Sequence, residues 1–551
     1  MRTAQDLNRE RKYKYQTPKQ LAERVQRLAS DRATAESHWQ EIADHIHPNR
    51  NNITTKEVTE GEKRFSDLLD NTGVHANELL GGALHGMMTS PNAMWFEMTT
   101  GNTRLDMQDD VREWMQNEVR EMHNILNNSN FHTEKHEMDL DQTAFGTGCM
   151  LMEDDDKDVV RFSTKFIADY YIDEDSSGRV NQIYRKWDCK PEDLIQEFGK
   201  EAMPKEVMDA FKLENSTQKF CVIHAIYPKR LFNPGDRAAQ PYHSQYIIKD
   251  LEFEIKTGSF DSLPYLTPRW SKAAGEKYGR GPGSVALPEC KVLNKMNETM
   301  LIGAQKLVDP PVQLPDDGFI LPLITSPGGI NYRRSGNSDD IIRPIFNDTR
   351  LDFGYQALED RRKRIRDAFY VDQLRLQQGG PMMTATEVMQ RTEEQMRLLG
   401  PMLGRQQSEF LKPMVDRLFL IRLKRGMVAP PPDVLRGANL GVRYSSFIAR
   451  SQRLNEAQNV MRWFESCAPF IQLDPATRHV FDGDAAIRTL AMVFNPPQEI
   501  IRSQKEVEQI KKQEQEQQQA MQEQMAAQAQ LQQGAQATQA MGAVGGTEQA
   551  V

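Results

Sequence analysis

Histidines and carboxylates that could bind a metal are the first candidates for chemistry in this sequence. His45 and His47 follow His38, but residues two apart on a helix point to different faces, and no carboxylate stands at a ligand spacing that would close a site. The acidic run at 153–158 has the charge of a calcium loop without the glycine and closing glutamate of an EF-hand. We interpret the histidines as surface or helix-end residues and the acidic run as a solvated hairpin tip. The sequence therefore predicts neither a metal nor a cofactor.

Glycines before a predicted helix could cradle a phosphate, and Gly279, Gly281 and Gly283 have that arrangement. No Lys-Ser/Thr pair follows them and strands do not alternate with helices, so a tight hinge into the helix is favoured. No serine lies in a GxSxG elbow. The chain has five cysteines outside any CxxC pair or nucleophile motif: Cys149, Cys189, Cys221, Cys290 and Cys467. These observations predict free thiols and a protein that is not an enzyme.

The sharpest charge cluster is a basic run on a predicted helix: Arg361, Arg362, Lys363, Arg364 and Arg366. Adjacent residues fan around a helix instead of lining one strip. Two interpretations stay open: some of these side chains face DNA phosphates, or they form a solvated or subunit-bridging surface. The net charge of −9 over 551 residues argues against a surface that grips DNA tightly.

The elements that position these residues are mainly helical. The composition is 38% hydrophobic and 8% aromatic with 27 methionines, which indicates helices with adaptable packing. Apolar periodicity predicts a helix or helix pair at 17–47, capped by Thr17-Pro18, and helices at 72–88, 106–126 and 131–145. Short β-type runs follow at 149–152, 159–162, 166–172, 182–187, 220–227 and 246–253, with helices inserted near 191–198 and 204–212. The predicted fold class is mainly α with a β-rich insert (α+β).

Two long helices are predicted, with a compact segment of short strands and turns between them. The first begins near Ser284 or Pro288 and ends at the helix breaker Asp309-Pro310-Pro311. Its predicted apolar stripe is Val285, Val292, Met296, Met300 and Leu307. After a Pro-, Gly- and Asp-rich stretch to residue 347, the second helix at 348–371 has the stripe Leu351, Tyr355, Leu358, Ile365 and Phe369. At 1.5 Å per residue each helix is about 35 Å long, so the pair predicts a stalk with a small domain at its tip.

The remaining chain alternates helices with breakers. Gly379-Gly380-Pro381 predicts a loop, after which Thr384 and Glu387 form a capping box for a helix to about residue 425, interrupted at Gly400-Pro401 and adjusted at Pro413. A proline boundary at 429–432 precedes a strand at 442–444, helices near 449–465 and 484–494, and a Gln-rich tail. The N-terminus has no signal-peptide pattern and the most apolar segment, 79–88, is too short to cross a bilayer, so no membrane partner is expected.

The order of short motifs resembles one family up to about residue 497: the head-to-tail connector, or portal, proteins of short-tailed phages. The matching pieces are Leu80-Gly81-Gly82-Ala83-Leu84, Thr89-Ser90-Pro91, Trp95-Phe96, Phe145-Gly146-Thr147-Gly148, Tyr278-Gly279-Arg280-Gly281-Pro282 and Thr384-Ala385-Thr386-Glu387-Val388. Each is weak alone, but their order, with the two-helix stalk between the last two, is specific.

The resemblance implies a division of the chain. Its expected parts are a wing (1–277), a first stem helix (278–307), a clip (308–347), a second stem helix (348–371), a tunnel loop (372–383), a long wing or crown helix (384–428), a crown (429–497) and a barrel or disordered tail (498–551). The expected tunnel loop carries Gln377, Gln378, Gly379, Gly380, Pro381, Met382 and Met383. The expected docking residues of the clip are Pro310, Pro311, Phe319, Arg333 and Arg334.

The resemblance also implies partners and a place. Members form a ring, usually of twelve subunits, at one capsid vertex of the virion after assembly in the host cytoplasm. The channel passes double-stranded DNA without sequence specificity, the clip meets the packaging terminase and then the tail adaptor, and the wing meets capsid and scaffold proteins. The alternatives are another virion assembly protein, such as a tail adaptor or core protein, or a packaging motor. The stalk disfavours an adaptor, and the sequence lacks the GxxxxGK[ST] loop of a motor.

Overall fold

The computed structural model describes residues 15–50, 52–55, 61–91, 93–106, 108–213, 218–229, 240–308, 312–313, 343–344, 351–374, 400, 402–435, 437, 440–444, 461–463, 465–467, 483, 487, 490, 506–507 and 509–525. The chain divides into two compact units. One comprises residues 1–97, 119–428 and 442–448, and the other comprises 98–118, 429–441 and 449–551. The first unit contains every element considered below as a candidate site. None of the described helices is both long and apolar enough to cross a membrane.

The predicted helix at 17–47 is a helix pair, α2 (Pro18–Asp31) and α3 (Ala33–Ile46). Thr17 and Gln20 form a reciprocal capping box at the start of α2, as the Thr-Pro signal predicts. The break between the helices is held by Arg32, whose buried guanidinium donates to the carbonyls of Ile167 and Ala168 at 3.1 and 2.8 Å. This buried cation fixes the helix pair to the segment that enters the main sheet.

The three predicted helices that follow are confirmed as α4 (Thr72–Met88), α6 (Asp109–Asn128), preceded by the short α5 (Thr103–Asp106), and α7 (Phe131–Phe145). Helices α4 and α7 pack against each other. A Cβ on Gly81 would lie 2.7 Å from a methyl group of Leu140, so the glycine permits their close approach.

The β-rich insert is a five-stranded antiparallel sheet and a smaller three-stranded sheet. The larger has the order β4 (Tyr170–Glu174), β5 (Val180–Cys189), β6 (Phe220–Pro228), β7 (Tyr242–Ile248) and β8 (Phe253–Phe260). The smaller has the order β3 (Val159–Thr164), β2 (Met150–Asp155) and β9 (Tyr265–Leu266). Side chains alternate along β6, so Ile223 faces α2 while Val222 faces α8 (Pro191–Phe198) and α9 (Lys205–Lys212). The α+β class is confirmed.

Two predicted strands have the wrong bounds. The run at 246–253 is not one strand: it spans the end of β7, a turn and the start of β8, because Glu252 adopts a positive φ of 48° and reverses the chain. The run at 166–172 becomes a strand only at Tyr170, since the amide of Asp169 closes a turn onto the carbonyl of Phe166 at 2.9 Å. Apolar content alone does not distinguish such turns from strands.

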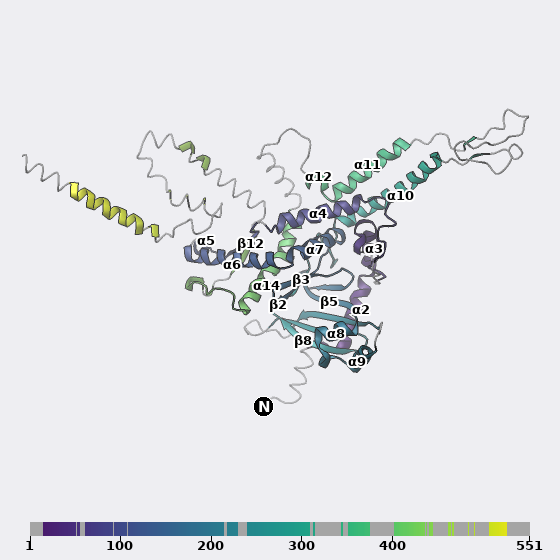
Figure 1. Cartoon of the computed structure of the whole chain (residues 1–551), viewed down its shortest axis with the longest axis horizontal. Helices are drawn as coiled ribbons and strands as arrows, with labels where there is room; N and C mark the ends of the chain where they lie inside the picture. Colours follow the sequence, from purple (N-terminus) through teal and green to yellow (C-terminus); the bar gives the residue numbers. More distant parts are fainter. Residues whose placement is uncertain are drawn as a thin grey trace, which may run out of the picture. The chain divides into compact units, whose positions relative to one another are not determined.

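The two long helices are confirmed as α10 (Pro282–Val308) and α11 (Leu351–Ala368), followed by the short α12 (Val371–Leu374). They lie side by side, and α10 also packs on α3, α4 and α7 (Figure 1). Between them β10 (Val312–Gln313) pairs antiparallel with β11 (Arg343–Pro344). We call α10 and α11 together the arm.

Residues 402–424 are helical, and they contain a π-helical turn, η3 (Gln407–Leu411), immediately before α14 (Lys412–Lys424). The predicted adjustment at Pro413 is therefore confirmed. The strand predicted at 442–444 is β12 (Gly441–Tyr444). The predicted capping box at Thr384 and most of the helices predicted near 449–465 and 484–494 lie outside the described residues.

Candidate functional site: the arm and its base

The base of the arm is a junction of two glycine motifs that are far apart in the sequence. Gly146 ends α7 with a left-handed φ of 85°, and a Cβ there would meet the backbone of residues 279–281. A Cβ on Gly281 would lie 2.7 Å from a carbonyl oxygen of α7, and one on Gly283 less than 3.0 Å from another. The amide of Gly279 donates to Thr147 Oγ1 at 2.8 Å. The backbones touch directly, so these glycines form a packed junction and leave no room for a phosphate.

A fully buried arginine supports this junction. Arg269 donates to the carbonyl of Lys277, just ahead of α10, at 3.1 Å, and to that of Gly178 at 3.0 Å. It pairs with Glu409 of the π-turn at 2.7 Å and with Glu174. Burial alone lowers the pKa of Arg269, but the two carboxylates raise it above its usual value. This pairing could not be predicted from the sequence, because the partners are 95 and 140 residues away.

Asp70 fixes the arm to α4. Its carboxylate, only 6% exposed, accepts from the amide of Thr72 at 2.9 Å, from Asn297 of α10 at 3.0 Å, and from two nitrogens of Arg362 of α11 at 2.9 and 3.0 Å. Burial raises the pKa of Asp70, but the hydrogen bonds from Thr72, Arg362 and Asn297 outweigh it and lower the pKa. One carboxylate thus joins three helices, and sequence reasoning missed it.

Asp70→Asn should lower the free energy of unfolding by about 2 kcal/mol at neutral pH, because it leaves buried donors without their charged acceptor. Since the folded pKa is depressed, the carboxylate stabilises the fold above the unfolded carboxyl pKa of about 3.9 and loses that effect as pH falls through the folded value. Thermal melting at pH 7 and pH 3 should show a smaller difference between variant and parent at pH 3. Asp360→Asn, on the exposed side of α11, is the control; equal effects of the two would contradict the role of Asp70.

Three of the five side chains of the basic run are held by carboxylates of this chain. Arg361 pairs with Glu289 of α10 at 2.7 Å, Arg366 pairs with Glu359 at 2.8 Å, and Arg362 is the partner of Asp70. The hydrogen bond from Arg361, with its charge, lowers the pKa of Glu289. These three guanidinium groups link or stabilise the helices of the arm.

The other two basic side chains project into solvent. Arg364 is 61% exposed and reaches Glu289 only at 3.4 Å. Lys363 is exposed and has no ion pair with a described carboxylate. The basic run is therefore divided into three residues held by short ion pairs, the largely exposed Arg364 with a longer contact to Glu289, and the exposed Lys363.

One side of α10 carries three exposed apolar residues, and Leu301, Ile302 and Val308 near the end of the helix are exposed on other sides. Val285, Val292 and Leu307 are 69, 42 and 50% exposed, and at about 100° per residue they lie within about 60° of one another. The other two residues of the predicted apolar stripe, Met296 and Met300, are partly buried. The helix instead buries Ala286, Leu287, Cys290 and Leu293. On the predicted stripe of α11, Leu358, Ile365 and Phe369 are buried, whereas Tyr355 is 61% exposed. The side chain of Leu351 lies outside the described residues.

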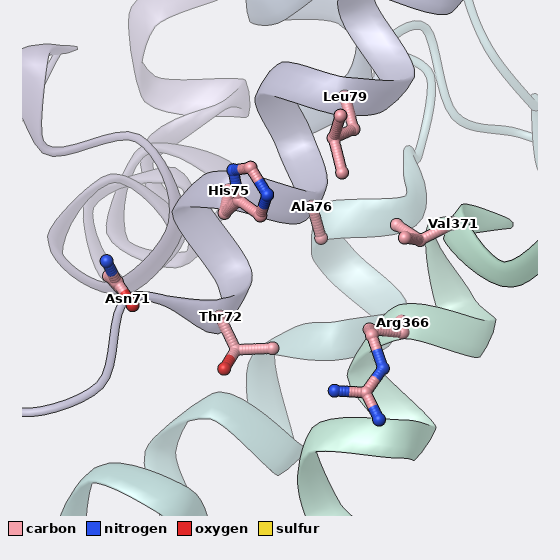
Figure 2. A pocket seen from close by; sticks show the side chains of 7 residues that line it. All are labelled: Asn71, Thr72, His75, Ala76, Leu79, Arg366 and Val371. Carbon is pink, nitrogen blue, oxygen red and sulfur yellow. The ribbon is translucent and has the colours of Figure 1, made fainter. Parts of the chain in front are cut away.

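A pocket of about 340 Å³ lies where α4 meets the end of α11, and Figure 2 shows α4 side chains facing Arg366 and Val371. Its lining is Asn71, Thr72, His75, Ala76, Leu79, Arg366 and Val371. Arg366 already pairs with Glu359. The residues that line the pocket include no acid–base pair typical of catalysis.

The other candidates for chemistry have structural surroundings. The acidic run is confirmed as the tip of the β2–β3 hairpin, where Arg425 pairs with Asp154. His47, at the end of α3, lies 3.3 Å from Asp141. Within the described part of the chain no group of three His, Cys, Asp or Glu side chains could hold a metal. The cysteines are free thiols, and all but Cys467 are buried.

The predicted docking and loop residues lie outside the described residues. This applies to Pro310, Pro311, Phe319, Arg333 and Arg334 of the expected clip, and to Gln377, Gln378, Gly379, Gly380, Pro381, Met382 and Met383 of the expected tunnel loop.

Comparisons with known proteins agree with the motif order. A family model described as "Bacteriophage head to tail connecting protein" matches residues 18–501. The chain is 31% identical over 501 residues to the "Probable portal protein" of Bordetella phage BPP-1, covering 90% of each chain. It is 27% identical over 502 residues to the "Portal protein" of Salmonella phage epsilon15, covering 89% of this chain and 90% of that protein. The chain therefore belongs to the family of bacteriophage head to tail connecting proteins.

Proposed function

We propose that this chain is the portal subunit of a phage, and that copies of it form a closed ring at one capsid vertex through which double-stranded DNA is packaged and ejected. The observation that carries the proposal is the family match over residues 18–501, together with two portal relatives aligned over nine-tenths of the chain. Such a protein acts by shape and surface, with no catalytic chemistry of its own.

The arm supplies the stem of the ring in this proposal. Helix α10 has 27 residues and is therefore about 40 Å long, enough for a channel segment. Residues 308–347 form the clip that receives the terminase and then the tail adaptor, and the paired β10 and β11 lie within this segment. Residues 1–277 form the wing towards capsid and scaffold proteins, 372–383 the tunnel loop, and 384–428 and 429–497 the long helix and the crown.

Lys363 and Arg364 are the side chains we assign to the DNA channel. The other three cations of the run are neutralised within the chain. Two exposed cations per subunit give weak contacts with phosphate and no reading of sequence, so DNA can slide past them. A mildly acidic chain is suited to translocation and not to tight binding.

The exposed stripe of Val285, Val292 and Leu307 supports self-assembly. An apolar helix face left in water is unfavourable and is typical of a surface that another molecule covers. In a closed ring each subunit contacts its neighbours through two different faces, so the stripe of one copy meets another surface of the next.

The purified protein should form closed rings of about twelve subunits with a central hole that admits duplex DNA. Negative-stain imaging together with mass measurement in solution checks this result. A persistent monomer, or a ring without a channel, under conditions that permit assembly would instead favour another virion assembly protein.

A further inference from the structure

The π-turn at Gln407–Leu411 interrupts a helix that is otherwise α-helical on both sides. Gln406 and Lys412 both have αR backbone angles, and the amide of Lys412 donates to the carbonyl of Gln407, five residues back. A π-turn takes one extra residue into a helical turn, and such turns occur frequently at functional sites.

The cause of the turn is in the sequence. Pro413 has no amide hydrogen, and in an α-helix its ring would collide with the carbonyl four residues back, that of Glu409. Widening the turn before Pro413 moves this carbonyl away from the ring. Pro413 thereby favours the π form at this place, although Pro288 is accommodated inside α10 without such a turn.

The turn sets the rotational phase of the helix. Met402, Gln406, Phe410, Met414 and Leu418 are all buried at intervals of four residues. In an uninterrupted α-helix, residues spaced four apart drift around the axis by about 40° per step. Over these four steps the drift is about 160°, so Met402 and Leu418 would face opposite sides. The extra residue removes about 100° of that rotation, which keeps the whole series on one buried face.

The same turn carries the carboxylate that holds the base of the arm. Glu409 accepts from the backbone amide of Arg269 at 2.9 Å and from its side chain at 2.7 and 3.1 Å. Arg269 in turn donates to the carbonyl of Lys277, and a Cβ on Gly279 would lie 3.0 Å from that of Arg269. A continuous line of contacts thus leads from the π-turn to residues 277–279, just ahead of α10.

We propose that Pro413 and the π-turn together fix the rotational orientation of this helix about its axis. They hold the helix in the orientation in which Glu409 accepts hydrogen bonds from Arg269. A rotation of the helix at this turn would therefore be transmitted to the base of the arm. Pro413 and Glu409 act as positioning residues: both are half-buried, and Glu409 acts through its contact with Arg269. The inference is independent of ring assembly.

The test compares Pro413→Ala, Glu409→Gln and the double variant by hydrogen exchange of the full-length protein, read at the amides of residues 278–290. Removing a proline from a helix normally strengthens the helix. The proposal predicts a loss of stability at the base of α10 instead. Pro413→Ala should make the amides there exchange about tenfold faster. Glu409→Gln should have the same effect, and the double variant should add nothing.

Pro288→Ala is the matched control, because Pro288 is an exposed helix proline on α10 itself. In this variant the amides of residues 278–290 should exchange no faster than in the parent protein. The proposal is overturned if Glu409→Gln speeds amide exchange at the base of α10 while Pro413→Ala leaves that exchange unchanged or slows it. It is equally overturned if Glu409→Gln has no effect there, because the contact with Arg269 would then be unimportant.

Discussion

Gly283→Ala should lower the free energy of unfolding by about 3 kcal/mol or more, the upper end of the cost of forcing an extra methyl group into a packed core. The new Cβ would lie less than 3.0 Å from the carbonyl oxygen of Ala144 and 3.0 Å from its Cα. These are backbone atoms in the last turn of α7, so no side-chain rotation relieves the collision. Either the start of α10 or the end of α7 must move, and the arm then loses its support.

Chemical denaturation of the full chain measures this loss, and limited proteolysis near residues 278–283 shows where the chain opens. Gly86→Ala is the control, since a Cβ on Gly86 of α4 meets nothing within 4 Å. Alanine is the better helix former there, so this variant should gain about 0.5–1 kcal/mol. Similar stability of both variants would show that the glycine junction tolerates a side chain.

Much of the fold could be predicted because local signals agree with the tertiary structure. Thr17-Pro18 caps α2, the predicted helix at 131–145 coincides with α7, and Pro413 is the site of the predicted adjustment. Bounds were wrong where a single backbone angle decides them, as at Glu252. A positive φ at a residue other than glycine has no reliable sequence signal.

The candidate site was only partly predictable, because it depends on pairs of residues distant in sequence. The glycine motifs at 146 and 279–283 were both identified, but nothing in either shows that they touch. The basic run was identified as well, yet its division into bound and exposed cations depends on Asp70 and Glu289. These two are ordinary acidic residues among the 78 in the chain.

The apolar stripe of α10 shows the limit of what periodicity predicts. Periodicity correctly detected that Val285 and Val292 share a helix face, but it cannot say whether that face is covered within the chain or by another chain. The structure shows that α10 buries a second, different face around Leu287 and Cys290. A helix that is apolar on two sides is typical of one buried in an assembly.

Val285→Glu combined with Val292→Glu should therefore abolish ring formation while leaving the fold intact. Both side chains are exposed in the single chain, so two carboxylates cost the subunit little. In the ring the same carboxylates would be buried without partners at every interface, at a cost of several kcal/mol per contact. Mass measurement in solution should show monomers in place of rings, and circular dichroism should show an unchanged helix content.

Leu213→Glu is the matched control, because Leu213 is 66% exposed, close to the 69% of Val285, and follows α9, well away from the arm in sequence. It should assemble as the parent does. This result would show that assembly depends on where the carboxylate is placed and not simply on added negative charge. Rings of normal size from the double variant would mean that the stripe faces solvent in the assembly; the contacts between subunits would then have to come from other faces, even if the chain is a portal subunit. Monomers from both variants would instead indicate a general sensitivity of assembly to added negative charge, which raising the salt concentration would relieve by screening.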